Sequence, residues 1–142
     1  MKKHIFLLVA MGCIGITTEI FFTAICDIIA QWPDIDSWAL KGVSYIWMFP
    51  IYGIAGIAFP AIMPYITRLP FILRMCIYGI GILVIEFITG WLLDIFTGRC
   101  PWEYTSGWHL MGYIRFDYLP LWALFGGLVE KIITFLQGHY KD

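Results

Sequence analysis

The chain has 142 residues, of which 61% are hydrophobic and only 13% charged, and its formal net charge is −1. Soluble domains are about 45–50% apolar, so this composition indicates a membrane protein and leaves no room for a separate soluble catalytic domain. The near-neutral charge and the lack of a basic run give no reason to expect a nucleic-acid partner, and the expected partner is the lipid bilayer.

The N-terminal sequence resembles a secretion signal, because two lysines precede an apolar run. The run continues well past Cys13, so we expect a retained first span from about His4 to Ala30. That length corresponds to about 39 Å of helix, enough for a tilted crossing. The residues 31–37, QWPDIDS, form the expected loop after it.

A second span is expected from about Val43 to Ile66, and a third from Arg74 to Gly98. Prolines interrupt the second span at Pro50, Pro60 and Pro64. Because proline removes a backbone hydrogen bond, this helix is expected to be kinked or broken.

The segment from Arg99 to Tyr118 is too interrupted by polar residues and glycine to cross a bilayer. We expect it to lie at the membrane interface on the non-cytoplasmic side, before a fourth span from about Leu119 to Leu136. The fold class expected is therefore an all-α membrane bundle of four spans, forming a single membrane domain.

Two expected spans carry carboxylates inside the membrane. Glu19 lies within the first span with Asp27 near its end, and Glu86 lies within the third with Asp94 near its end. A charge at the bilayer centre costs roughly 2.5–3.5 kcal/mol even on the lenient insertion scales. Each carboxylate therefore needs a partner, a water-filled cavity or a bound proton.

The spacing of these carboxylates is part of an internal repeat. The first-span pattern recurs 67 residues later in the third span, pairing Gly12 with Gly79, Glu19 with Glu86, and Asp27 with Asp94. At an offset of 70, WALKG at 38–42 matches WHLMG at 108–112. Repeat one covers about 4–66 and repeat two about 74–137. Two-span repeats share one orientation, so Glu19 and Glu86 are expected to face each other or the same cavity, with Asp27 and Asp94 as a second pair.

The distribution of lysine and arginine predicts the orientation in the membrane. Six of these residues fall on the side of the termini: Lys2, Lys3, Arg68, Arg74, Lys131 and Lys141. The other side carries Lys41, Arg99 and Arg115. By the positive-inside rule, both termini are predicted to be cytoplasmic, with the protein in the cell membrane.

The interfacial segment supplies further candidate binding residues. Arg115, near Asp117 and His109, would pair with a carboxylate or bind an anionic group, or would simply extend its charge to the interface. A second set consists of the aromatic residues Trp102, Tyr104 and Trp108. These would line a binding mouth or stack on a cation, or would form an ordinary aromatic belt.

The cysteines are expected to be small buried apolar residues: Cys13, Cys26, Cys76 and Cys100. They are scattered, without a CxxC motif or a Cys/His cluster, so neither a metal site nor a cofactor is expected.

Several segments resemble a known family: PIYG at 50–53, EFITGWLLD at 86–94, PWEYTSGWHLMGYI at 101–114 and LWALFG at 121–126. In these segments the chain is similar to the family named Putative ABC-transporter type IV (CmpB-like), which includes the transmembrane protein 229 group. It departs from the family pattern at Thr105, often Ser, and at His109, often Asn. The resemblance implies a permease. Any ATPase would be another chain, because no GxxxxGK[ST] motif occurs.

The leading functional hypothesis is a permease-like protein that moves a small solute through the Glu19 and Glu86 carboxylates. Four spans enclose little volume, so a homodimer or another membrane subunit is expected to complete the path. A lipid-modifying membrane enzyme is the second hypothesis, with His109 or Arg115 directed at the carboxylates. A non-catalytic assembly protein, whose carboxylates are fully satisfied internally, is the third.

Overall fold

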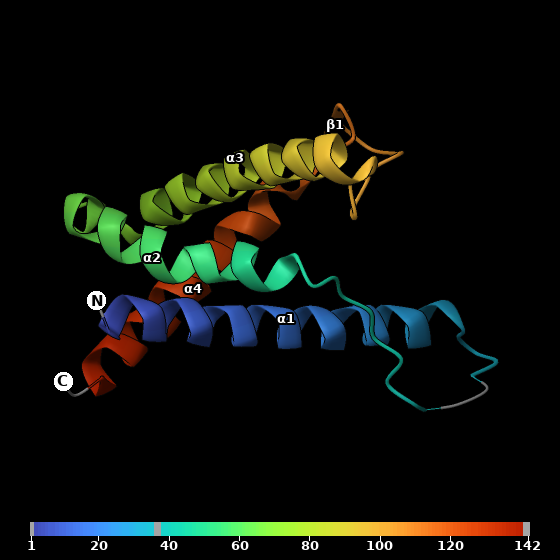
Figure 1. The fold of residues 1–142 in the computed structure, drawn as a ribbon, viewed down its shortest axis with the longest axis horizontal. Helices are drawn as coiled ribbons and strands as arrows, with labels where there is room; N and C mark the ends of the chain where they lie inside the picture. Colours follow the sequence, from blue (N-terminus) through green and yellow to red (C-terminus); the bar gives the residue numbers. More distant parts are fainter. Residues whose placement is uncertain (1, 36–37, 141–142) are drawn as a thin grey trace. The chain divides into compact units, whose positions relative to one another are not determined.

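A computed structural model of the chain describes residues 2–35 and 38–140 (Figure 1). Ser37, at the end of the expected loop, and Lys141, used to predict orientation, lie outside these residues. Four long helices dominate the described part: α1 (Lys2–Ala30), α2 (Met48–Ile66), α3 (Phe71–Thr97) and α4 (Leu119–His139). All four are long and apolar enough to cross a membrane. The expected all-α membrane architecture is confirmed.

The chain divides into two compact units, with the boundary between Phe59 and Pro60. Unit 1 contains α1 and α2 up to Phe59, together with Tyr140. Unit 2 begins at Pro60 and contains the end of α2, all of α3, the interfacial segment and α4. Each unit is described by itself below.

The second span begins later than predicted, at Met48 rather than Val43. The preceding residues are held against α1, where the Thr23 hydroxyl accepts a hydrogen bond from Val43 N at 2.9 Å and donates one to Val43 O at 3.1 Å. These bonds satisfy the Val43 backbone without a helix. The helix then continues through Pro60 and Pro64, so the predicted alternative of a broken helix is wrong and that of a kink stays a prediction. Pro50 lies in the first helical turn, where no backbone N–H has an intrahelical partner.

The third span ends as predicted, at a glycine. Gly98 caps α3 in the left-handed conformation with φ 77°, and its N–H donates to Asp94 O at 2.8 Å. Glycine adopts this conformation without the steric penalty of a side chain.

The segment from Arg99 to Tyr118 forms no spanning helix, as predicted, and instead contains a small hairpin that was not predicted. Strands β1 (His109–Leu110) and β2 (Ile114–Arg115) pair antiparallel, and a 3₁₀ turn, η1 (Phe116–Tyr118), leads into α4. The turn between the strands contains Gly112 at φ 77°. Tyr104 N donates to Gly112 O at 2.8 Å, which joins the hairpin to the residues before it.

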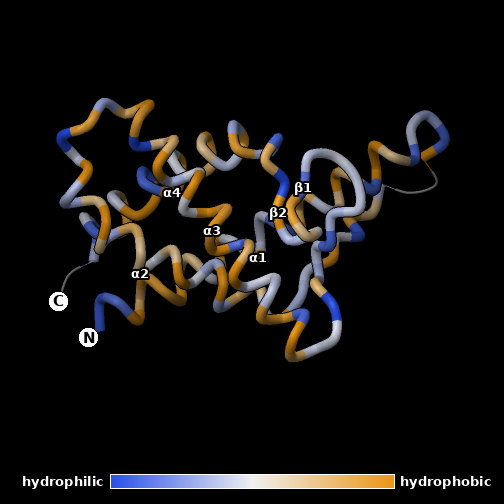
Figure 2. The backbone as a smooth tube through the Cα atoms, turned by 90° about the horizontal axis from the view of Figure 1, so that it is seen from above, coloured by the Kyte–Doolittle hydropathy of each residue, from blue (hydrophilic) through white to orange (hydrophobic). Residues whose placement is uncertain are grey.

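The helices pack closely through small residues, while many large apolar side chains face outward. In unit 2, a Cβ atom at Gly79 would lie 2.9 Å from Ala123 N, so α3 and α4 approach almost backbone to backbone. Hydrophobic residues recur along each helix in Figure 2, and exposed apolar side chains suit a lipid solvent. Cys100 is buried as expected, but the prediction is wrong for the other three cysteines, which are exposed on the helices.

Candidate functional site

Glu86 is half-buried on α3 and has two differently placed carboxylate oxygens. Its Oε1 accepts a hydrogen bond from the Tyr104 hydroxyl at 2.9 Å. Its Oε2 is buried and has no hydrogen-bond partner among the described residues. The indole N–H of Trp122, on α4, is buried and unpartnered in the same way.

Aromatic rings surround these polar groups in unit 2. Tyr118 packs edge-on against both Tyr104 and Trp122, with ring centroids 5.7 Å and 6.4 Å away, respectively. Phe125 extends the series, 6.2 Å from Trp122. Edge-to-face contacts of this kind are favourable beyond the area they bury, so the rings form a rigid wall.

Arg115 closes the same aromatic cluster from the hairpin side. Its guanidinium lies over the Tyr118 ring at 4.2 Å and over the Tyr104 ring at 6.0 Å. It pairs with Asp117, and this hydrogen-bonded pairing raises the pKa of Arg115. Arg115 is therefore paired with its neighbour Asp117 and packs over two rings of the aromatic cluster.

The polar groups of this cluster are held in a nearly dry environment. Burial raises the pKa of the Tyr104 hydroxyl, and the neighbouring Glu86 charge raises it further. Tyr104 therefore stays protonated and keeps donating to Glu86 over the whole ordinary pH range. A buried polar atom without a partner costs about 1–3 kcal/mol, so the unsatisfied pair Glu86 and Trp122 is an expensive feature of the fold.

Asp94 connects the hairpin to the end of α3. Its Oδ2 accepts a hydrogen bond from the Tyr113 hydroxyl at 2.7 Å, and this bond raises the pKa of Tyr113. Trp102 donates from Nε1 to Tyr113 O at 3.1 Å, so it holds the hairpin in place. Cys100 is buried beside Gly90, and burial raises the pKa of its thiol.

In unit 1, the corresponding carboxylates have simpler partners. Glu19 Oε2 accepts a hydrogen bond from the Ser44 hydroxyl at 2.7 Å, in the extended segment that packs on α1. Asp27 is exposed and accepts from the Gln31 side chain at 2.8 Å. The predicted meeting of Glu19 with Glu86, and of Asp27 with Asp94, would join the two units and stays a prediction.

His109 and Trp108 do not join the Glu86 cluster. Both are exposed; His109 stands opposite Arg115 across the hairpin, and Trp108 packs against Phe116 with ring centroids 5.7 Å apart. Among residues 2–35 and 38–140, no three His, Cys, Asp or Glu side chains are placed to share a metal ion.

Sequence reasoning missed a buried ion pair in unit 2. Arg74, on α3, donates from Nε and Nη2 to the two oxygens of Glu130, on α4, both at 2.9 Å. Tyr78 donates to the same carboxylate at 2.8 Å, and Arg74 also donates to the carbonyl of Leu69 at 2.8 Å. Every one of these atoms is well partnered, which is typical of a structural connection. The available signal was Glu130 itself, an acid inside an apolar run.

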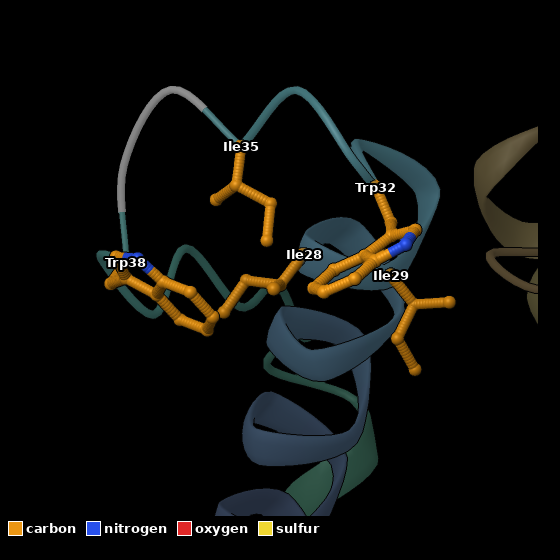
Figure 3. A pocket seen from close by; sticks show the side chains of 5 residues that line it. All are labelled: Ile28, Ile29, Trp32, Ile35 and Trp38. Carbon is orange, nitrogen blue, oxygen red and sulfur yellow. The ribbon is translucent and has the colours of Figure 1, made fainter.

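Unit 1 contains an apolar pocket of about 330 Å³ where α1 ends (Figure 3). Its lining is aliphatic and aromatic: Ile28, Ile29, Trp32, Ile35 and Trp38. None of the intramembrane carboxylates lines this pocket, so its lining is apolar, whereas the Glu86 cluster contains polar groups.

A family model described as Putative ABC-transporter type IV matches residues 5–140, nearly the whole chain. The chain belongs to this family. The resemblance seen in the sequence is confirmed, and the match covers both units, including Glu86, Tyr104 and Trp122 of the cluster. No solved structure matches the chain. The protein is thus a multi-pass membrane protein of a transporter-related family.

Proposed function

We propose that the protein is a permease-like membrane protein that moves a small solute, with the Glu86 cluster as its binding centre. The observation that carries this proposal is the Oε2 atom of Glu86, buried in a span without a partner. Intramembrane acids are expensive, and their usual roles are substrate, ion or proton binding. A purely structural acid would instead resemble Glu130, which is saturated by its neighbours.

The internal repeat supports a transporter architecture. We infer that the two units are parallel repeats, because residues at equivalent positions lie beside equivalent residues. Thr23 bonds to Val43 in unit 1, and a Cβ atom built at Gly90, 67 residues after Thr23, would lie 3.3 Å from Tyr113 Cβ, 70 residues after Val43. In this arrangement Glu19 is the counterpart of Glu86. The protein would lie in the cell membrane with both termini in the cytoplasm. A second copy or another membrane subunit would complete the path of the solute.

Solute entry into reconstituted vesicles tests the proposal. Liposomes with and without the protein are mixed with glycerol, urea, methylammonium chloride or sodium formate, and light scattering follows their reswelling. We expect faster entry of at least one solute in the presence of the protein. Glu86→Gln, which keeps the shape and an acceptor for Tyr104, should reduce the protein-dependent rate about tenfold or more, since it weakens a charged hydrogen bond.

Glu103→Gln is the matched control, because Glu103 is an exposed acid of the same unit, outside the cluster. Its protein-dependent rate should stay within about twofold of the wild type, in line with the small effects of exposed charges. The proposal fails if no solute enters faster than in protein-free liposomes, or if Glu86→Gln is as fast as Glu103→Gln.

A further inference from the structure

Two buried atoms of unit 2 lack complementary partners: an acceptor, Glu86 Oε2, and a donor, Trp122 Nε1. Buried polar groups in folded proteins are almost always hydrogen-bonded to protein or to an ordered molecule. Tyr104, which bonds to Glu86, packs against Tyr118, and Tyr118 packs against Trp122, so both groups belong to one cluster. A third group placed between them would satisfy both.

We propose that Glu86 and Trp122 together bind the hydroxyl group of a small neutral molecule. The hydroxyl donates a hydrogen bond to Glu86 Oε2, and its oxygen accepts a hydrogen bond from the Trp122 indole N–H. This inference deepens the proposed function, on which it rests, by assigning the substrate class at the same carboxylate: water or a short alcohol.

Other classes of ligand would satisfy only one of the two unpartnered groups. An ammonium ion donates to the carboxylate but has no lone pair for the indole N–H, which would stay unpaired. An anion accepts from the indole but meets the Glu86 charge, and Arg115, which would favour it, is already paired with Asp117. A hydroxyl is the simplest group that both donates and accepts.

The surroundings suit such a ligand. The hydrogen bond from Tyr104 to Oε1 fixes the orientation of the carboxylate. The rings of Tyr118 and Phe125 both pack against the indole of Trp122, so the donor lies among apolar rings. Apolar walls with a few placed polar groups are typical of small-molecule sites.

The test follows the indole N–H of Trp122 by NMR in protein labelled with ¹⁵N-tryptophan and held in lipid nanodiscs. Trp122→Phe assigns the signal among the seven tryptophans. We expect a magnetisation-transfer contact with water, and a saturable shift on addition of ethanol or glycerol. Methylammonium chloride should leave the signal unchanged. A water contact without an alcohol shift supports the site with water as its occupant, and an alcohol shift supports a solute.

Glu86→Gln should change this signal, whereas Glu103→Gln should not. If glycerol enters the vesicles, Trp122→Phe should slow it about tenfold, the loss expected for one hydrogen bond, while keeping the aromatic wall. The inference is overturned if the wild-type Trp122 signal shows neither a water contact nor an alcohol shift, or if methylammonium shifts it instead. Solute entry that depends on Glu86 but not on Trp122 would reject this inference and leave the proposed function standing.

Discussion

Replacing Gly79 by alanine tests the close approach of α3 and α4 on which the Glu86 cluster depends. The new Cβ would lie 2.9 Å from Ala123 N and 3.1 Å from Ala123 Cα, both backbone atoms. Ordinary contacts between such atoms are about 3.5–4.0 Å, so the helices must separate by about 0.5 Å. Overpacking of this kind costs about 1–3 kcal/mol, while the better helix propensity of alanine returns about 1 kcal/mol. The difference is about 0–2 kcal/mol, so we expect Gly79→Ala to destabilise unit 2 by about 1 kcal/mol.

Gly81→Ala is the matched control on the same helix. Gly81 is exposed, and a Cβ there meets nothing within 4 Å. Only the propensity gain applies, so this variant should be stabilised by about 0.5–1 kcal/mol. The two variants differ by one methyl group each and lie two residues apart, so their difference isolates the helix contact.

The thermal stability of both variants is measured in detergent. The protein is heated, and a fluorogenic maleimide reports the temperature at which the Cys100 thiol becomes exposed. The other three cysteines are first replaced by serine, so that the signal reports unit 2, where Cys100 is buried. The midpoint for Gly79→Ala should fall by roughly 3–6 °C, and that for Gly81→Ala should not fall. Equal midpoints for the two variants would refute the backbone contact between α3 and α4.

Two further outcomes follow from the contacts of unit 2. Glu130→Gln weakens the ion pair with Arg74 and should lower the same thermal midpoint by at least about 3 °C. Replacing both Glu130 and Arg74 by leucine should recover much of this loss, because apolar packing can often replace a buried ion pair. Tyr113→Phe removes a hydrogen bond that joins the hairpin to α3, so Cys100 should react with maleimide about fivefold faster at 25 °C. An unchanged reaction rate would show that this hydrogen bond does not hold the hairpin closed.

The sequence was sufficient to predict the helices, because length and apolar composition determine what can cross a bilayer. The ends of the first and third spans were predicted within a few residues, and Gly98 was recognisable as a stop. The start of the second span was wrong because the segment around Val43 bonds to the Thr23 side chain, a contact between residues 20 apart that no local pattern encodes.

Half of the central cluster was visible from sequence. Glu86 was identifiable by its position in an apolar run, and Tyr104 by its place in the aromatic segment. Trp122 was missed, because a tryptophan near a span end is typical of an aromatic belt. The pairing of Glu130 with Arg74 was missed because the two residues lie 56 positions apart and meet only through the register of two packed helices.

The carboxylates of the two proposed repeats have different partners, and this difference bears on which one binds solute. Glu19 is hydrogen-bonded by Ser44, whose counterpart 70 residues later is Ile114, a buried residue that cannot donate from its side chain. Glu86 therefore relies on Tyr104 for one oxygen and keeps the other unpartnered. If the repeats acted symmetrically, Glu19→Gln and Glu86→Gln would slow solute entry equally. The unequal partners favour a larger loss for Glu86→Gln, since Glu86 alone stands beside an unpartnered indole donor, and equal losses in the vesicle assay would argue that both carboxylates line one path.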